Sequence, residues 1–475
     1  MSNTPFNLIN PPFEKEANHE PVIGTELAEA YNQSRNGSGH QCFCYAPSAN
    51  MYFSQDGSVH VCCHNMEYSL GKYPEQTIRE IWNSAKTNEL RQHMRNYDLS
   101  HGCRICESDV RMCSFNEVPA RHFDHIPKHP EYPTMMEFLI SNTCNLECVM
   151  CKGEYSSLIR KNREHLPPLR TPYDKEFLNQ LEEFIPFLHE ARFSGSGEAF
   201  SIDMNYEIWG KLIRKNPKCV IMVQTNGTIL TARVKDILSR GNFQIGVSLD
   251  GMTKATYEGI RVNANFDKVM ENVRYFADYC REKKIKFSLA MCAMRQNWRE
   301  LPDFINFCNS MNAVAIIHKV WNPLEYALHK LPKEGLYEVY DYLATFDFKA
   351  DTERQNLNRS HYRYFVSVVK TWAEKVAEIS HIKSMHNGEL FLYLKEKLKN
   401  GYSAKPGTSE EKKAILEDSM NKMQAVLNHF NSNQRENLLR WACAKKSDIV
   451  SQPLEKYPVD YLVKLAKVTA DIELE

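Results

Sequence analysis

Three cysteines near the middle of the chain have a spacing that suits a metal centre. Cys144, Cys148 and Cys151 lie within eight residues, in the segment SNTCNLECVMC. Cysteine thiolates bind zinc and iron–sulfur clusters, and a four-iron cluster held by three thiolates keeps one iron with an open coordination position. A small molecule can bind at such a position and react there. A structural zinc site and three incidental thiols are the alternatives that the spacing leaves open.

A second group of cysteines precedes the first. Seven of the 15 cysteines lie between residues 42 and 113, and they include Cys103 and Cys106 in a C-x₂-C spacing. A hairpin cysteine, a loop cysteine and this pair can converge as four thiolates around a second metal centre. A Cys₄ zinc site is the alternative occupant. The five cysteines outside both groups are scattered singly, and we expect them to be small buried hydrophobic residues.

The segments that must position the first group alternate between strand and helix. Six apolar segments of strand length and five amphipathic segments of helical length predict parallel βαβ units, with the chemistry at the carboxyl ends of the strands. The expected fold is α/β, with an open or partial (β/α)₆ barrel over residues 131–325. The expected strands are 135–141, 191–195, 219–226, 243–250, 285–292 and 313–319, and the expected helices are 174–189, 202–215, 231–240, 265–283 and 299–311.

The flanking regions have weaker patterns. We expect an extended arm over residues 1–40 and a small cysteine-rich domain over residues 41–130. That domain is predicted to contain a hairpin at Asp56-Gly57, a favoured hairpin turn, and a helix at 76–95. Residues 326–475 carry many helical signals and few strand signals, so they predict a helical C-terminal domain.

Composition narrows the class of protein. The 475 residues include 59 basic and 59 acidic side chains, so the net charge does not favour binding to nucleic acid or to an anionic membrane. The N-terminus lacks a basic stretch followed by an apolar run, and no apolar run of about 18 residues occurs. We therefore expect a cytoplasmic protein without a membrane segment. In such a protein, 15 cysteines favour metal binding over disulfides.

The central region resembles the radical SAM superfamily, whose members cleave S-adenosylmethionine (SAM) at a [4Fe–4S] cluster. The resemblance rests on the C-x₃-C-x₂-C spacing after the first strand, followed in order by RFSGSGEAF, TNG, SLDG and YEGIR. It implies that Cys144, Cys148 and Cys151 hold the cluster and that SAM occupies the open iron. Glycines let the backbone approach a ligand closely, and a guanidinium suits a carboxylate. The residues implied to contact SAM are Met150 near the adenine, Gly195, Ser196, Gly197 and Glu198 near the methionyl amino group, Asn226, Ser248 and Asp250 near the ribose, and Arg261 near the carboxylate. Met150 stands where an aromatic residue is commoner, and Ser196 where many members have glycine.

The cysteine-rich domain resembles the SPASM and twitch modules that hold auxiliary iron–sulfur clusters. The resemblance implies one auxiliary cluster, expected to be [4Fe–4S], with Cys44, Cys62, Cys103 and Cys106 as ligands. Cys42 and Cys63 are alternatives to their neighbours, but Cys62 keeps the Gly-x₄-Cys spacing of these modules. Such modules usually follow the barrel, whereas this one precedes it. The chain must therefore bring it back over the barrel, and a cluster separation far beyond about 20 Å would not suit electron transfer.

The resemblance implies an enzyme that cleaves SAM reductively and abstracts a hydrogen atom from its substrate. An auxiliary cluster can then accept an electron, which gives oxidation or a cross-link, or it can anchor the substrate. A thiol that returns a hydrogen atom gives epimerisation, and Cys113 and Cys292 are the expected donors. The expected substrate is a peptide, by analogy alone, and a sugar or small metabolite is the alternative. The expected electron donor is a flavodoxin- or ferredoxin-like protein. A non-catalytic iron–sulfur assembly protein and an RNA-modifying enzyme are the other classes left open.

Overall fold

The computed structural model describes residues 22–35, 37, 39–111, 113–403, 405–445 and 447–470. These residues form two compact units. One unit extends to Lys330 and also includes Asp341–Val366, and the other contains Leu331–Tyr340 and the residues from Ser367 onward. The cysteine-rich module and the barrel therefore belong to one unit.

The first unit is built on one sheet of nine strands in the part of the chain that the structure describes, with the order β3-β2-β1-β4-β5-β6-β7-β8-β9. From β4 to β9, each strand pairs in parallel with the next one along the chain. These six strands are the six that the sequence predicts, so the α/β fold with a partial barrel is confirmed. The strands are β1 (Asn50–Phe53), β2 (Ser58–His60), β3 (Gly71–Lys72), β4 (Met135–Phe138), β5 (Glu190–Phe193), β6 (Val220–Thr225), β7 (Phe243–Ser248), β8 (Phe287–Ala293) and β9 (Val314–Lys319).

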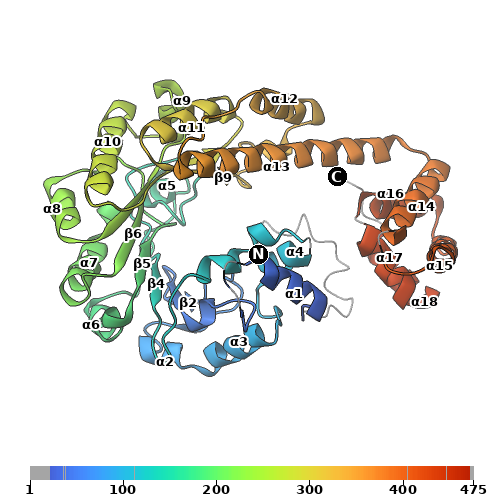
Figure 1. Ribbon diagram of the computed structural model, residues 1–475, viewed down its shortest axis with the longest axis horizontal. Coiled ribbons are helices and arrows are strands. Elements are labelled where there is room, and N and C mark those ends of the chain that lie inside the picture. The colour runs from blue at the N-terminus through green and yellow to red at the C-terminus, as the bar shows by residue number, and fades with distance from the viewer. Residues whose placement is uncertain are drawn as a thin grey trace. The chain divides into compact units, whose positions relative to one another are not determined.

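Helices cover the outer face of this sheet, as Figure 1 shows for α6, α7, α8 and α10. Local polar residues begin them: the side chains of Asp174, Thr231 and Asn265 accept hydrogen bonds from the first turns of α6, α8 and α10. The helices of the first unit are α1 (Thr25–Ser34), α2 (Ile78–Trp82), α3 (Ala85–Arg95), α4 (Arg104–Arg111), α5 (Ser157–Asn162), α6 (Lys175–Phe184), α7 (Asp203–Lys215), α8 (Ala232–Arg240), α9 (Lys254–Ile260), α10 (Phe266–Glu282) and α11 (Leu301–Ser310). Short 3₁₀ turns lie at Ala46–Ser48, Phe115–Glu117, Pro119–Phe123, Ile185–Phe187, Ala199–Ser201, Trp298–Glu300 and Leu328–Lys330.

The two faces of the sheet differ in polarity. Phe138 and Phe193 stack on each other, and Phe193 also contacts Trp209 of α7, so these side chains face the outer helices. Successive side chains on a strand point to opposite faces. Glu137 and Arg192, which are paired in register on β4 and β5, therefore face the barrel interior. The interior face is thus polar where the outer face is aromatic.

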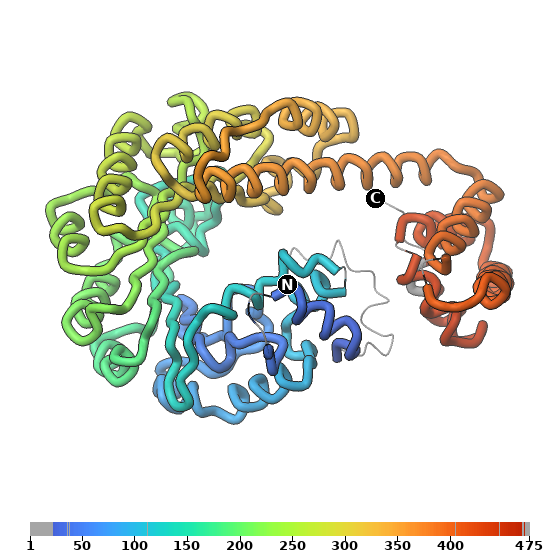
Figure 2. Tube along the Cα trace, in the orientation of Figure 1, coloured from blue at the N-terminus to red at the C-terminus, as the bar shows by residue number. Residues whose placement is uncertain are grey.

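The cysteine-rich module is an extension of the barrel sheet. Strand β1 pairs in parallel with β4, and β1, β2 and β3 form an antiparallel extension that contains the predicted Asp56-Gly57 hairpin. Figure 2 shows the β1 and β4 segments side by side. The predicted helix at 76–95 is two helices, α2 and α3, because Ser84 adopts extended backbone and caps α3. An ion pair also connects the module to the opposite edge of the sheet, since Glu117 lies 3.9 Å from Lys319 of β9.

The expected arm over residues 1–40 differs from the structure in its second half. Residues 1–21 lie outside the described part, but Thr25–Ser34 form helix α1, so an extended arm is wrong for this segment. Ala28 and Tyr31 are its buried residues, and Arg35 at its end pairs with Asp124. Buried Tyr31 and Arg35 anchor the helix to the module, a tertiary effect that a short polar sequence does not reveal.

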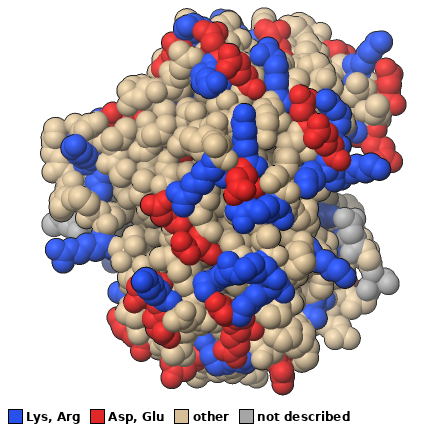
Figure 3. All heavy atoms as spheres, turned by 90° about the vertical axis from the view of Figure 1, so that its left-hand side faces the viewer, with Lys and Arg blue, Asp and Glu red and all other residues tan. Residues whose placement is uncertain are grey.

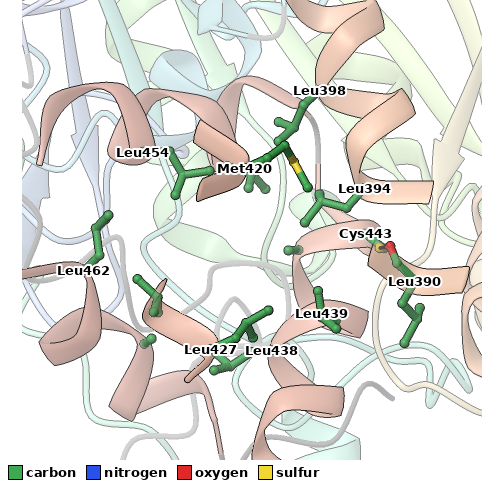
Figure 4. Close-up of a cluster of buried hydrophobic side chains, with 14 of the residues drawn as sticks. Leu390, Leu394, Leu398, Met420, Leu427, Leu438, Leu439, Cys443, Leu454 and Leu462 are labelled. Atoms are coloured by element: carbon green, nitrogen blue, oxygen red, sulfur yellow. Dashed lines mark hydrogen bonds between the residues drawn. The ribbon is translucent and has the colours of Figure 1, made fainter. Parts of the chain in front are cut away.

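The second unit is helical, as expected. Its core is a cluster of buried side chains that includes Leu390, Leu394, Leu398 and Met420, shown in Figure 4. Its helices are α14 (Asn387–Ser403), α15 (Ser409–Leu427), α16 (Ser432–Ala444), α17 (Ser447–Lys456) and α18 (Val459–Thr469), while α12 (Lys333–Ala344) and α13 (Glu353–Ser384) contribute residues to both units. Among the helices described, none combines the length and apolar composition needed to cross a lipid bilayer.

Charged side chains of both signs are interspersed on the face of the molecule drawn in Figure 3. Ion pairs also form between or within outer helices, such as Arg233 with Asp203 and Arg240 with Asp236. A face of mixed charge does not create the strong positive potential that attracts a phosphate backbone. This face therefore gives no support to RNA binding.

Candidate functional site

The first cysteine group forms a loop directly after β4, and neighbouring backbone fixes that loop. The amides of Glu147 and Val149 donate to the carbonyl oxygens of Val262 and Ile260, at 3.1 and 2.9 Å. The amide of Cys144 donates to the hydroxyl of Ser157 at 3.2 Å. The loop is therefore held on one side by the segment after α9 and on the other by the start of α5.

Burial controls the electrostatics of the three thiols. It raises the pKa of Cys144 to about 11 and that of Cys151 to about 12. Burial also raises the pKa of Cys148, but Arg261 opposes this rise because its Nη1 lies 3.8 Å from the Cys148 Sγ. Thiols lose their protons when a cationic centre binds them, since the metal stabilises the thiolate form. The donor set thus fits an iron–sulfur cluster with three protein ligands.

Arg261 belongs to a buried network at the ends of β7 and β8. Its Nε and Nη2 donate to Asp250 Oδ2, both at 2.7 Å, and the Cys292 amide donates to Asp250 Oδ1 at 2.6 Å. Burial acts to lower the pKa of Arg261, but the charges of Asp250 and Cys148 raise it well above its ordinary value. Asp250 is fully buried and both its oxygens have donors. In this geometry Asp250 positions Arg261 and the end of β8, and its predicted contact with the ribose of SAM stays a prediction.

Glu198 forms a second buried network beside the cysteine loop. Its carboxylate accepts hydrogen bonds from the Asn226 amide at 2.7 Å and from the Thr225 hydroxyl at 2.6 Å. Burial raises its pKa, while these hydrogen bonds oppose the rise. The Glu198 amide donates to Thr143 at 2.7 Å, so the turn after β5 is joined to the cysteine loop. Gly197 in this turn has φ +65°, and a Cβ there would lie 2.7 Å from the Thr143 oxygen.

The other residues expected to contact SAM surround the same loop to different degrees. Asn226 donates to Asn145 of the cysteine loop at 2.9 Å, and Ser248 accepts from Gln224 at 2.9 Å. Gly195 has φ +88°, and the Ser196 hydroxyl donates to Ser141 at 3.0 Å. Met150 and Cys292 pack against one small apolar cluster that contains Met294 and Val320. The structure therefore brings the barrel residues of the predicted site together around the cysteine loop, at the carboxyl ends of the strands.

Four cysteines of the N-terminal module line a single apolar cavity. They are Cys44, Cys62, Cys103 and Cys106, and the cavity walls include Leu90 and Met94 of α3. Burial raises the pKa of Cys103 to about 12 and raises those of the other three thiols as well. Backbone amides near the cavity support the sulfurs, since the Ala46 amide donates to Cys44 Sγ at 3.4 Å. Four convergent thiolates suit an iron–sulfur cluster or a zinc ion.

The alternative cysteines do not line this cavity. The Cys42 thiol donates to the Cys44 carbonyl oxygen at 3.4 Å. Cys63 is exposed, and the charges that act on its thiol are those of Glu137 and Arg192 at the barrel interior. Cys113 is an exposed residue after α4 with φ 54°. The other expected hydrogen donor, Cys292, packs against the same small apolar cluster as Met150 of the first cysteine loop.

Two further sets of residues at the site are not among those that the sequence predicts. Asn297 is fully buried and donates to the carbonyl oxygens of Asp250 and Cys292, both at 2.9 Å, so it fixes the ends of β7 and β8. Glu137 and Arg192 form the polar interior face described above, and burial raises the pKa of Glu137 while Arg192 lowers it. Glu137 could have been found from the sequence, because it is a glutamate within the otherwise apolar strand MMEFLIS. Nothing in the sequence distinguishes Asn297.

Two family models match the chain. Residues 138–308 match the model described as the radical SAM superfamily, and residues 42–107 match SPASM, an iron–sulfur cluster-binding domain. The first match spans the three-cysteine loop and the Glu198 and Arg261 networks. The second spans all four cysteines that line the apolar cavity.

Curated relatives match only part of the chain. A cysteine-type anaerobic sulfatase-maturating enzyme of Clostridium novyi (strain NT) is 26% identical over 181 residues, which are 35% of this chain and 45% of the relative. A probable GTP 3′,8-cyclase of Pyrococcus abyssi is 26% identical over 172 residues, which are 35% of this chain and 52% of the relative. The chain thus spans about half the length of these relatives.

Solved structures show the same kind of partial likeness. Native anSMEcpe with bound AdoMet is 18% identical, with a TM-score of 0.34 and coverage of 49% of this chain and 61% of that chain. Streptococcus suis SuiB bound to precursor peptide SuiA is 12% identical, with a TM-score of 0.31 and coverage of 56% of this chain and 61% of that chain. Both values of identity are too low to transfer an activity.

Proposed function

Because the chain belongs to the radical SAM superfamily and carries an N-terminal SPASM iron–sulfur domain, we propose that it abstracts a hydrogen atom from a peptide substrate. When bound, a cluster held by three thiolates with SAM on its open iron supplies a 5′-deoxyadenosyl radical on reduction. The protein residues bind and orient SAM, exclude water and position the substrate. The product is an oxidised, cross-linked or epimerised peptide.

One observation carries the proposal. The three-cysteine loop, the guanidinium of Arg261 and the turn that contains Gly197 meet at the carboxyl ends of the barrel strands. Arg261 Nη1 lies 3.8 Å from Cys148 Sγ, and the Glu198 amide donates to Thr143 at 2.7 Å. A guanidinium beside the cysteine loop would suit the carboxylate of SAM. The glycine turn suits its amino group, because the absence of a side chain allows close approach.

We assign distinct tasks to the buried residues of this site. Asp250 uses both carboxylate oxygens on Arg261 and on the Cys292 amide, so its task is to hold the guanidinium in place. Glu198 binds the backbone of the loop after β6 and thereby sets the position of Asn226. These carboxylates are positioning residues, and Arg261 is the residue that contacts SAM.

A peptide substrate is supported by the sulfatase-maturating relative, whose name describes the maturation of another protein. The cavity of four cysteines supports an auxiliary cluster, which would take up an electron from the substrate radical or bind the substrate. The interior residues Glu137 and Arg192 offer charged groups for the polar backbone of a peptide. The cyclase relative favours a small-molecule substrate instead.

The test is anaerobic reconstitution with iron and sulfide, followed by incubation with SAM and a strong reductant. We expect 5′-deoxyadenosine in the protein with intact cysteines and none in C148S, with C219S as the matched control because Cys219 is a buried cysteine at the start of β6. Mass spectrometry of peptides co-expressed from neighbouring genes then identifies the modification. If the reconstituted protein binds iron but forms no 5′-deoxyadenosine, the proposal is wrong. If 5′-deoxyadenosine forms and only metabolites change, the peptide assignment alone is wrong.

A further inference from the structure

A second group of metal-binding side chains lies on the surface of the cysteine-rich module, apart from the cysteine cavity. Glu89 and His93 are one turn apart on α3, and His101 lies in the loop after that helix. One ligand atom from each of the three residues lies within 4.8 Å of the other two. Residues at i and i+4 share a helix face, so α3 presents two ligands to the same point.

Hydrogen bonds on the far side of each ligand orient it toward the common point. His93 Nδ1 lies 2.6 Å from a carboxylate oxygen of Asp98, and His101 Nδ1 lies 2.9 Å from the hydroxyl of Ser100. Glu89 Oε2 accepts the hydroxyl of Tyr68 at 2.6 Å, which leaves Oε1 facing the histidines. Metal-bound histidines almost always donate their other ring nitrogen to a carboxylate or another acceptor, because this contact fixes the ring and its tautomer.

The distances suit a shared ion better than a direct ion pair. Glu89 Oε1 and His101 Nε2 are 3.5 Å apart, which is too long for a good hydrogen bond. Two ligands of a tetrahedral zinc ion, with bonds of about 2.0–2.2 Å, lie about 3.4 Å apart. The centroids of the His93 and His101 rings are 3.9 Å apart, so both rings approach one location. Two protonated imidazoles at this separation would repel each other.

We propose that Glu89, His93 and His101 bind a zinc ion. Two nitrogens and one oxygen are borderline-hard donors that zinc accepts, and water completes a tetrahedral site. The ion would join α3 to the loop that leads into the auxiliary cysteines. Leu90 and Met94 of the same helix line the cysteine cavity.

The loop has a direct connection to one cluster ligand. Asn65 Nδ2 donates to the His101 carbonyl oxygen at 2.7 Å and to Cys103 Sγ at 3.4 Å. A zinc ion on His101 therefore holds the backbone that positions Cys103. The site is structural, and it stabilises the rim of the auxiliary centre without taking part in its redox chemistry.

The experiment measures zinc in the full-length protein after growth with zinc and reconstitution with iron and sulfide. We expect about one zinc per chain by mass spectrometry of the metals, with nitrogen and oxygen neighbours at about 2.0–2.2 Å in the zinc-edge X-ray absorption spectrum. H93A should lose this zinc, and D98N should lower the affinity for added Zn²⁺ by about 10- to 100-fold. The control is H125A, since His125 is exposed and lies outside the group.

Three results would overturn the site. They are a protein that takes up no Zn²⁺, a zinc spectrum with sulfur neighbours at about 2.3 Å only, and an H93A protein that keeps the nitrogen- and oxygen-bound zinc. If circular dichroism shows that H93A does not fold, the zinc content of E89Q and the zinc-edge spectrum of the wild-type protein decide whether the site exists. Sulfur-bound zinc together with missing iron would instead contradict the auxiliary iron–sulfur cluster. The two failures are therefore distinguishable.

Discussion

The buried pair of Asp250 and Arg261 provides the sharpest test of the barrel site. In D250N the new amide keeps an acceptor for the Cys292 backbone, but it leaves the guanidinium without a counter-charge. The two side chains are 0% and 8% exposed, so water cannot replace the lost carboxylate. Removal of one partner from a buried pair costs about 3–5 kcal/mol. We therefore expect a large loss of local stability at the ends of β7 and β8.

Hydrogen exchange followed by mass spectrometry suits this prediction, because it measures the local stability of each peptide segment separately. The two compact units of the protein can therefore be followed independently. A cost of about 3–5 kcal/mol corresponds to about 140- to 3,700-fold faster exchange, at about 1.4 kcal/mol per tenfold change. The faster exchange should appear in peptides that contain residues 248–252 and Cys292. Helices α14–α18 serve as an internal reference, since their exchange should not change.

The matched control is D236N, which makes the same chemical change in a surface pair. Asp236 and Arg240 are 62% and 53% exposed, and such a pair is worth about 0.3–0.5 kcal/mol. Its effect on exchange should be about twofold. If D250N and D236N change exchange near their own sites to the same extent, Asp250 does not balance a buried charge, and its assignment as a positioning residue is refuted.

Three further variants test other parts of the molecule. C62S should remove the auxiliary cluster, about four iron atoms per chain, whereas C63S should keep it, because Cys62 lines the cavity and Cys63 does not. Equal iron loss from both variants in a colorimetric assay would contradict this ligand choice. G197A should bind SAM more weakly, as measured by isothermal titration calorimetry, because the added Cβ would lie 2.7 Å from a carbonyl oxygen of the cysteine loop. G259A is the control and should bind SAM normally, because a Cβ at that position has no heavy atom within 4 Å. L394A should lower the free energy of unfolding of the helical unit by about 2–5 kcal/mol in denaturant titrations, because the Leu394 side chain is fully buried. Truncation of an exposed leucine of the same helix is the control and should change this free energy by less than about 0.5 kcal/mol.

The sequence predicts the barrel well because its strands are long, apolar and separated by amphipathic helices. Each expected strand from 135 to 319 is present, with ends that differ by a few residues. Two local features were less visible. A single residue with extended backbone, Ser84, divides one expected helix into α2 and α3, and helix α1 owes its stability to buried Tyr31 rather than to its own composition. The first effect is a local cap, whereas the second depends on residues distant in sequence, since Tyr31 stacks on Phe43 and Arg35 pairs with Asp124.

The candidate site shows the same division between local and distant information. The cysteine spacing and the glycine-rich turn are local signals, and they lead to the loop and turn that the structure joins. The actual partners of Asp250 are not local, because Arg261 and the Cys292 amide come from other elements. These hydrogen bonds show a positioning role for Asp250 that the sequence does not reveal, beside its predicted contact with the ribose of SAM. Asn297 gave no signal at all, because its role depends only on the distance between two strand ends.

The position of the cysteine-rich module follows from sheet geometry rather than from its place in the sequence. Tyr52 of β1 pairs with His60 of β2, and this antiparallel register brings Cys62 close to Asn50 at the start of β1. Asn50 pairs with Met135 at the start of β4, whereas Cys144 lies after the end of that strand. The two cysteine groups are therefore at opposite ends of the barrel, offset by two strand spacings of about 4.8 Å and by a strand length of about 13 Å, at about 3.3 Å per residue. These two offsets combine to about 16 Å, and the polar interior face of Glu137 and Arg192 lies between the two groups. The pairing of β1 with β4 therefore places the module against the barrel, although the module precedes the barrel in sequence.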